Sequence, residues 1–539
     1  MTDDVAARLE RRTDTTLTAA LIAAASSHAG PPDIILDADG RRLGYRDLMR
    51  GIFALGSAIR RITEPGERVG VLLPTSAAGA VTFFALLAYG RVPAMLNFTA
   101  GRATLDAACA VAGVKTILTA QKFIAGANLS ALAEGLAETR SLVHLEDLRA
   151  RLGIADKLAG LAGAGLHRLR GAAAKPDDPA VILFTSGTEG EPKGVALSHR
   201  NILANIAQVD ETLPILATDI FFNPLPIFHS YGLMAGLILP LVLGRQLVLH
   251  PSPLQTKLIP QRIHETGATI LLATDTFLRQ YARAGDRRSM NSLRFSVCGA
   301  ERVRPETRDF VRERYGFVVL EGYGVTEAAP VLAVNHPDDI RDGTVGRLLP
   351  AIEARLEPVD GLDGRGRLSV RGPNVMLGYL SRTEPGGIAP PPGGWHDTGD
   401  VASIDAEGYV TIHGRLKRFA KIGGEMVSLA IVENCAATLW PDHLHTAAVI
   451  PAVRKGEEIV LVTEYADADA ASLLAWAKTR GVPELAVPKT ILHVEAIPVL
   501  GTGKIAHAAV DTLVRERLAA AAPGRAVEWD APPGKRAAG

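Results

Sequence analysis

The N-terminal half of the chain alternates between short apolar runs and longer helical stretches. The apolar run at residues 68–73 precedes a small, apolar stretch at 76–89 that is typical of a buried helix, and another run follows at 114–118. Strands that are apolar throughout are typical of parallel sheets that helices cover on both faces. The pattern therefore predicts βα units with buried parallel strands.

The pattern changes near Gly343 to short strands that lie between glycine-rich turns. These strands are expected at residues 354–356, 366–370 and 408–412. Alternation with a period of two and closely spaced turns predicts a small β-barrel-like subdomain. A mixed α/β segment of about a hundred residues follows Lys417, and that length is normal for a domain.

The chain is too long for one hydrophobic core, because single cores stop growing near about 250–300 residues. With 539 residues, 47% of them hydrophobic, the chain is expected to form at least two domains. The predicted fold class is α/β, with a large N-terminal domain of βα subdomains plus the small β-barrel-like subdomain, followed by a small α+β C-terminal domain. The expected bounds are 14–416 and 417–520, with a disordered tail at 521–539.

Composition argues against several classes of protein. Lys plus Arg equals Asp plus Glu at 58 each, so no global charge favours nucleic acid. The three cysteines are widely spaced, which argues against a disulfide framework or a zinc site. The N-terminus lacks the apolar core of a signal peptide, and the apolar stretches at 77–89 and 233–243 are too short to cross a bilayer. We therefore expect a cytoplasmic protein without a transmembrane segment.

The segment 185–194, TSGTEGEPKG, carries the clearest candidate chemistry. It follows the strand-like run 180–184. Its glycines let backbone N–H groups approach phosphate oxygens, its hydroxyls donate hydrogen bonds, and Lys193 supplies positive charge. The Walker A spacing is not satisfied, and a flexible surface turn is the alternative interpretation.

This segment resembles the signature loop of the adenylate-forming superfamily, which includes acyl-CoA synthetases, luciferases and peptide-synthetase adenylation domains. Further segments resemble four other motifs of that superfamily in the same order, at 321–327, 395–400, 414–417 and 501–505. Five colinear motifs are far more specific than any one of them. The resemblance implies an enzyme that uses ATP to activate a carboxylic acid as an acyl-adenylate and then passes the acyl group to a thiol.

The resemblance also implies roles for individual residues. A carboxylate that attacks the α-phosphate brings two anions together, so catalysis must neutralise charge and align the groups. Lys504 is the implied residue for this work, with Thr326 as a phosphate donor and Glu327 as the ligand of Mg²⁺. Tyr323 would stack on adenine. The implied nucleotide-binding residues are Thr185, Ser186, Gly187, Thr188, Gly190, Lys193, Gly322, Tyr323, Gly324, Asp400 (on the ribose hydroxyls) and Arg415.

Each of these roles has a plainer structural alternative. Lys504 would otherwise be an exposed lysine in a turn, and Tyr323 would be an ordinary core aromatic. Asp400 would otherwise form an Asx-turn at the end of a strand. The company of the other motifs favours the functional interpretation in each case.

Residues 224–232 resemble the superfamily segment beside the acyl pocket. Amino-acid-activating relatives carry an Asp there to hold the substrate ammonium, whereas this chain has Phe228 and His229. A buried, unpaired ammonium is costly, so the pattern disfavours an amino-acid substrate. His229, Gly299 and Ala300 are expected to line or gate this pocket, and simple packing is the alternative role for His229.

Two segments resemble a narrower group, the acyl-acyl-carrier-protein synthetase half of a bifunctional bacterial enzyme that reacylates lysophospholipids. They are residues 91–101 and 418–428. This resemblance implies a long-chain fatty acid and the phosphopantetheine thiol of acyl carrier protein. CoA is the alternative acceptor, and a catalytically inactive binding protein on the same fold is the alternative from another class. The C-terminal domain would be mobile and swing about Lys417, and Gly423 and Gly424 would make room for the pantetheine arm.

Residues 148–170 are basic and predict an amphipathic helix. One interpretation places this helix on an anionic membrane surface, and the other makes it a linker that covers the N-terminal core. Asp156 is the only acidic residue within this stretch. The expected apolar face consists of Leu148, Leu152, Ala155, Ala159, Ala162, Leu166 and Leu169.

Overall fold

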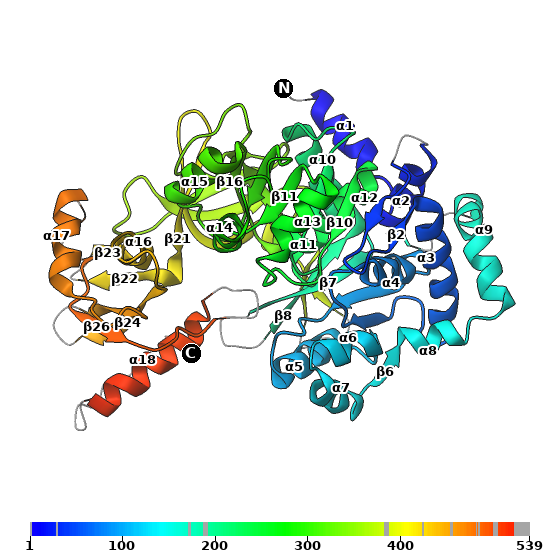
Figure 1. Ribbon diagram of the computed structural model, residues 1–539, viewed down its shortest axis with the longest axis horizontal. Helices are drawn as coiled ribbons and strands as arrows, with labels where there is room; N and C mark the ends of the chain where they lie inside the picture. The colour runs from blue at the N-terminus through cyan, green and yellow to red at the C-terminus, as the bar shows by residue number, and fades with distance from the viewer. Residues whose placement is uncertain are drawn as a thin grey trace, which may run out of the picture. The chain divides into compact units, whose positions relative to one another are not determined.

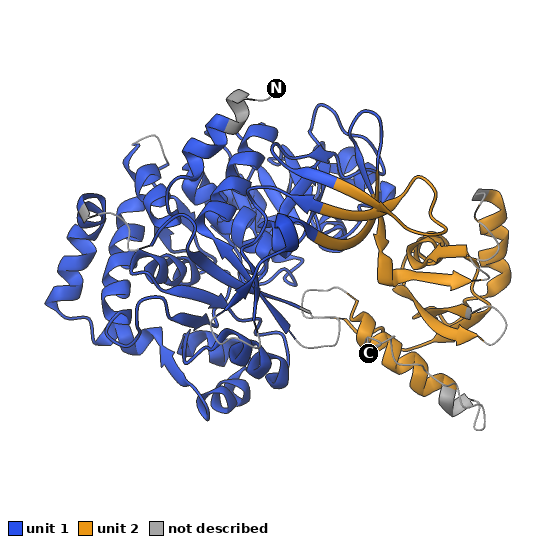
Figure 2. Cartoon of the chain, turned by 180° about the vertical axis from the view of Figure 1, so that it is seen from behind, with its two compact units in different colours: residues 1–354, 370–396, 404–411 blue, residues 355–369, 397–403, 412–539 orange. Residues whose placement is uncertain are grey.

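The chain separates into two compact units in the computed structural model (Figure 1). Unit 1 comprises residues 1–354, 370–396 and 404–411, and unit 2 comprises 355–369, 397–403 and 412–539 (Figure 2). The structure describes residues 3–27, 31–170, 174–186, 192–381, 387–422, 425–452, 456–480, 482, 486–499 and 505–521.

Unit 1 contains a nine-stranded sheet with a parallel centre. Its order is β15-β14-β13-β12-β11-β9-β10-β1-β2, and the pairings from β13 to β1 are parallel. β11 is buried along its whole length, as expected for a strand covered on both faces. The strands are β1 Ile35–Leu36, β2 Arg42–Leu43, β9 Ile220–Asn223, β10 Gln246–Leu249, β11 Ile270–Ala273, β12 Phe295–Cys298, β13 Val318–Gly324, β14 Val331–Val334 and β15 Arg347–Leu348.

A second sheet of unit 1 has eight strands in the order β19-β18-β8-β7-β4-β3-β5-β6. Strands β3 and β5 and the helix α4 between them in sequence confirm the predicted alternation. Ser76 caps α4 by accepting a hydrogen bond from the Gly79 N–H. The strands are β3 Arg68–Val71, β4 Val92–Met95, β5 Thr116–Thr119, β6 Ser141–His144, β7 Pro179–Ser186, β8 Pro192–Ser198, β18 Gly378–Leu380 and β19 Ile388–Ala389.

Helices connect the strands of both sheets. No helix of the described residues is both long enough and apolar enough to span a membrane. The helices of unit 1 are α1 Asp3–Thr13, α2 Leu17–Ser26, α3 Tyr45–Ile59, α4 Ala77–Ala88, α5 Arg102–Ala112, α6 Gln121–Gly126, α7 Ser130–Ala137, α8 Leu145–Ala150, α9 Ile154–Arg170, α10 His199–Thr212, α11 Ser230–Leu233, a π-helix Met234–Ile238, α12 Leu239–Leu243, α13 Leu258–Thr266, α14 Asp275–Ala284 and α15 Pro305–Tyr315.

The predicted β-rich subdomain forms a four-stranded sheet in the order β16-β17-β20-β21. The described part of the segment after it folds as a five-stranded sheet with helices α16, α17 and α18, and two apolar clusters lie within it. The strands of the first sheet are β16 Glu353–Pro358, β17 Gly366–Arg371, β20 His396–Ile404 and β21 Val410–Arg415. The later elements are β22 Phe419–Ile422, β23 Glu425–Ser428, α16 Leu429–Leu439, β24 His445–Ala452, β25 Gly456–Thr463, α17 Ala470–Arg480, β26 Thr490–His493 and α18 His507–Ala521.

The single helix predicted at residues 148–170 is two helices, α8 and α9, and its predicted apolar face is wrong. Leu148 is buried on α8, whereas Leu166 and Leu169 on α9 are exposed. α9 instead packs on α3 through its small residues: a Cβ on Gly163 would lie 2.3 Å from the Phe53 ring, and one on Gly160 would lie 2.9 Å from the Arg50 carbonyl oxygen. The close approach of the two helices requires glycine there, which turns the larger side chains outward.

We expect Gly163→Ala to destabilise the protein by about 1–3 kcal/mol, because the new methyl group overlaps the Phe53 side chain. Gly165→Ala is the matched control on the same helix, since a Cβ there meets no atom within 4 Å. It should stabilise the protein by about 0.5–1 kcal/mol through helix propensity. Denaturant unfolding measures both changes, and equal effects from the two substitutions would contradict this packing.

Candidate active site

A turn between β13 and β14 presents Thr326 and Glu327. It is a 3₁₀ turn, Thr326–Ala328, and both residues are half-buried. The Asn374 amide donates to the Ala328 carbonyl at 2.7 Å, and the Met376 N–H donates to the Glu327 carbonyl at 2.8 Å. These hydrogen bonds fix the turn from outside, so the two side chains have a defined position.

Glycine is required where β13 enters this turn. A Cβ on Gly324 would lie 2.2 Å from the Pro330 carbonyl oxygen, a distance that no side chain allows. Tyr323 and Gly322 precede it on β13, paired with Ala333 and Val334 of β14. The structure therefore brings Gly322, Tyr323, Gly324, Thr326 and Glu327 to one sheet end.

The hairpin of β7 and β8 carries the described part of the predicted phosphate loop. Thr185 on β7 lies opposite Lys193 on β8, and Ser186 follows Thr185. Gly187, Thr188 and Gly190 lie outside the described residues. The loop itself is thus flanked by paired strands.

Tyr379 connects this hairpin to the Glu327 turn. Its hydroxyl donates to Oε1 of Glu327 at 2.7 Å, and Lys193 Nζ lies 5.0 Å from its ring centroid. β18, which carries Tyr379, pairs with β8 next to Lys193, with Tyr379 opposite Val195. A cation and a carboxylate suited to a polyphosphate and its counter-ion are therefore held on either side of one phenol.

The donor set fits a magnesium ion bound together with phosphate. Glu327 is half-buried and accepts one hydrogen bond at Oε1, an arrangement that orients the carboxylate. No group of three or more His, Cys, Asp or Glu side chains suited to a metal occurs in the part of the chain that the structure describes. Magnesium in nucleotide sites needs only one or two carboxylates, because phosphate oxygens and water complete its shell.

The start of α11 lies between this turn and an apolar region. Ser230 Oγ is 3.2 Å from Thr326 Oγ1, and the next residue, Tyr231, donates its hydroxyl to the Val297 carbonyl at 2.8 Å. Burial raises the pKa of Tyr231 well above its usual value, so the phenol stays neutral. A Cβ on Gly299 would lie 3.6 Å from the Tyr231 ring, so Gly299 is a direct neighbour of this region.

Tyr231 lines an apolar cavity of about 40 Å³ within unit 1. The side chains come from α10, β9, the segment from α11 to α12, β11, β12 and β14. None of the described residues that line it is charged. They are Val209, Leu213, Ile215, Phe221, Tyr231, Ala235, Leu239, Ile270, Leu272, Phe295, Val297, Val331 and Val334.

A π-helix, Met234–Ile238, contributes Ala235 to the lining of this cavity. The Asn223 amide donates to the Gly232 carbonyl at 3.0 Å, and a Cβ on Gly236 would lie 2.2 Å from the same amide. A side chain that takes a carbonyl from the helical ladder shifts the hydrogen bonds of the next turn. The apolar stretch at 233–243 is thus helical, with a π turn beside the cavity.

His229 and Ala300 are less informative. The half-buried His229 precedes α11, and its ring centroid is 4.7 Å from that of Phe228. Ala300 follows β12 with a φ of +69°, which is unusual for a residue with a side chain. Their roles at an acyl pocket stay predictions.

Unit 2 holds the other predicted nucleotide contacts. Arg415 Nε lies 2.9 Å from Oδ1 of the buried Asp400, and Arg415 Nη1 donates to the Thr398 carbonyl at 2.7 Å. Thr398 Oγ1 also accepts from the Asp400 N–H at 3.1 Å, so the backbone of Asp400 is held within its turn. Lys417 is exposed in the short helix Leu416–Arg418. Lys504, Gly423 and Gly424 lie outside the described residues.

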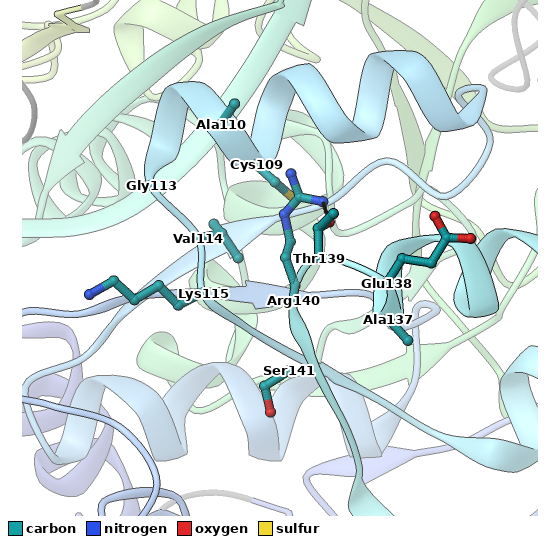
Figure 3. A pocket seen from close by; sticks show the side chains of 10 residues that line it. All are labelled: Cys109, Ala110, Gly113, Val114, Lys115, Ala137, Glu138, Thr139, Arg140 and Ser141. Atoms are coloured by element: carbon teal, nitrogen blue, oxygen red, sulfur yellow. Dashed lines mark hydrogen bonds between the residues drawn. The ribbon is translucent and has the colours of Figure 1, made fainter.

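A larger hollow of about 610 Å³ lies at the ends of α5 and α7 (Figure 3). It contains none of the predicted site residues. The Arg140 side chain reaches toward Cys109, while Lys115 and Glu138 point in opposite directions. Arg140 is paired with Asp106, and burial raises the pKa of Cys109 to about 11. Neither group is therefore prepared for chemistry there.

Sequence reasoning missed Tyr379, Ser230 and Tyr231. Tyr379 is 52 positions from Glu327 in sequence, and tertiary contacts of β18 and of the residues just before it bring the two together. Ser230 and Tyr231 fall in the segment 224–232, but the sequence assigned neither of them a role. Because successive side chains of a helix point in different directions, a helix that begins in this segment would place Ser230 and Tyr231 in different surroundings.

The family model described as AMP-binding enzyme matches residues 23–380, more than half of the chain. The chain belongs to this family. It is an adenylate-forming ligase that uses ATP to activate a carboxylic acid as an acyl-adenylate, and it is of the AMP-forming acid–thiol class. The match contains the β7–β8 hairpin, the Thr326 turn and the apolar cavity.

Known proteins similar to this ligase agree with the family. Feruloyl-CoA synthase of Amycolatopsis sp is 29% identical over 480 residues, 86% of this chain and 93% of the relative. Medium-chain fatty-acid–CoA ligase of Escherichia coli K12 is 30% identical over 351 residues, 61% of this chain and 60% of the relative. The crystal structure of ATP-bound MatB from Rhodopseudomonas palustris has a TM-score of 0.75 at 24% identity, covering 93% of this chain and 99% of that one. This last likeness concerns the fold.

We expect Glu327→Ala and Asp400→Ala each to lower the rate of ATP–pyrophosphate exchange by about a hundredfold or more. The first removes the oriented carboxylate of the turn, and the second removes the buried partner of Arg415. Glu407→Ala, which changes an exposed carboxylate paired with Arg341, is the control and should exchange normally. Wild-type exchange in both test variants would refute the assigned roles.

Proposed function

We propose that this ligase activates a neutral, apolar carboxylic acid of compact or medium length and transfers the acyl group to the thiol of CoA. The observation that carries the proposal is the apolar cavity beside the Thr326–Ala328 turn. Among the described residues that line it, only Tyr231 has a polar side chain, and its hydroxyl already donates to a backbone carbonyl. An acid with a charged or strongly polar tail would lose its hydration there without gaining a partner.

Large apolar side chains bound the cavity, which supports a shorter acid than the long chain expected from sequence. Phe221, Phe295 and Leu239 are among the side chains that bound it. The relatives named feruloyl-CoA synthase and medium-chain fatty-acid–CoA ligase support this proposal.

Each group of residues has a proposed task in adenylate formation. Lys193 and the hydroxyls of the β7–β8 hairpin hold the phosphates, and Thr326 donates to the α-phosphate. Glu327, oriented by Tyr379, would hold Mg²⁺, which supplies charge neutralisation when bound. Asp400 and Arg415 bind the ribose, and Lys504 aligns the carboxylate with the α-phosphate.

Two candidate functions differ in the thiol that accepts the acyl group. The named relatives reported above are CoA ligases, which supports CoA. The segments 91–101 and 418–428 resemble acyl-carrier-protein synthetases, which supports the phosphopantetheine of a carrier protein as the second candidate. In either case we propose that the C-terminal domain swings about Lys417, so that Gly423 and Gly424 face the thiol channel.

One assay with both acceptors tests this proposal. The enzyme is given ATP, magnesium and octanoate, and thioester formation is followed with CoA and with holo-acyl carrier protein. We expect kcat/KM for CoA to exceed that for the carrier protein by about tenfold or more. A preference for the carrier protein would reverse the assignment, and a lack of acyl-AMP with apolar acids would reject the substrate class.

The chain-length limit has its own test in Leu239→Ala. Leu239 lines the cavity, so its truncation should raise the kcat/KM ratio of long to medium acids by about tenfold. Leu241→Ala is the matched control, because Leu241 is buried on the same helix but does not line the cavity. It should lower stability similarly, by about 2–5 kcal/mol, without changing the ratio. The same ratio in both variants would show that this cavity does not hold the acyl chain.

A further inference from the structure

Helix α9 presents its large apolar residues to solvent. The exposed fractions are 79% for Ile154, 58% for Leu158, 66% for Leu161 and 85% for Leu169. Exposed apolar residues are ordinary when they are scattered, but four along one side of a helix are not. Figure 1 shows α9 beside α3 at the edge of unit 1.

The four residues form one stripe along the helix. Steps of four, three and eight residues at 100° each keep all of them within about 80° of arc. The opposite side of α9 is buried: Gly160 and Gly163 contact α3, and His167 packs edge-on against Phe53 at 6.2 Å. The packing of α9 on α3 therefore fixes the outward position of the four apolar residues.

The charge on this surface is positive. Lys157 and Arg168 are exposed and lie along one edge of the stripe. The only acidic residue of α9, Asp156, is turned inward, where Arg61 binds it. Buried pairing removes the one negative charge from the outer face, so cations and apolar side chains remain there.

We propose that this face of α9, consisting of Ile154, Lys157, Leu158, Leu161, Arg168 and Leu169, docks on the surface of an anionic lipid membrane. Leucines that enter the headgroup region lose their contact with water, and Lys157 and Arg168 meet lipid phosphates at the same depth. A second copy of the chain fits less well, because a symmetric pair would bring the same cations together. Apolar acids partition into bilayers, so docking there brings the enzyme to its substrate.

Vesicle sedimentation of the full chain tests the proposal. We expect binding to vesicles of equal parts phosphatidylcholine and phosphatidylglycerol, weakened by salt, and no binding to phosphatidylcholine alone. Lys157→Gln with Arg168→Gln should lower the partition coefficient roughly twenty-five-fold, about fivefold for each cation. Leu158→Gln with Leu161→Gln should lower it at least as far. Leu254→Gln, which changes an exposed leucine outside α9, is the matched control and should bind like the wild type.

Two further measurements decide between the outcomes. Thermal unfolding of each variant checks the fold, which these exposed positions should leave intact. Vesicle binding that neither double variant changes, or sedimentation with neither vesicle type, would overturn the proposal. Dimerisation of the wild type that is lost in the leucine variant would also overturn it, because a second copy would then cover the stripe.

Discussion

The hydrogen bond from the Tyr379 hydroxyl to Glu327 links the two large sheets of unit 1 at the candidate site. Tyr379 belongs to the eight-stranded sheet, and Glu327 lies in the turn between two strands of the nine-stranded sheet. Asn374 and Met376, which precede β18, bind the same turn through its backbone carbonyls. The positions of Lys193 and the Glu327 carboxylate therefore depend on strand pairing and on these hydrogen bonds, a preorganisation that suits phosphoryl chemistry.

Adjacent residues of one short helix serve two different environments. Ser230 lies next to the hydroxyl of Thr326, whereas Tyr231 lines the apolar cavity. Successive helical side chains diverge by about 100°, so a single turn can form the boundary between a polar and an apolar compartment. The π turn that follows, with Asn223 bound to the Gly232 carbonyl, positions Ala235 and Leu239 on the apolar side. The buried amide of Asn223 thus helps to position the boundary between the polar and apolar compartments.

Much of the fold and part of the site could be predicted from local sequence. Buried strands such as β3 and β5, and the glycine required at 324, leave signals within a few residues. The bond between Tyr379 and Glu327 leaves none, because it depends on strand pairing. For helix α9 a local sequence pattern gave the wrong result. The apolar periodicity predicts one buried face, but the size of the side chains that fit against α3 decides which face is buried. A hydropathy pattern carries no information on how closely two helices approach each other.

The packing of α9 on α3 also explains why its cationic and apolar side chains face outward. Moving the leucines inward would require space that the backbone of α3 and the Phe53 ring occupy. Asp156 ties the start of the helix to Arg61, so a rotation of the helix would also break this ion pair. Two independent effects, the steric exclusion by α3 and the ion pair of Asp156 with Arg61, thus oppose a rotation of α9 that would bury its exposed apolar residues. The exposed face is a consequence of how the helix packs, and any partner must match leucines and cations together.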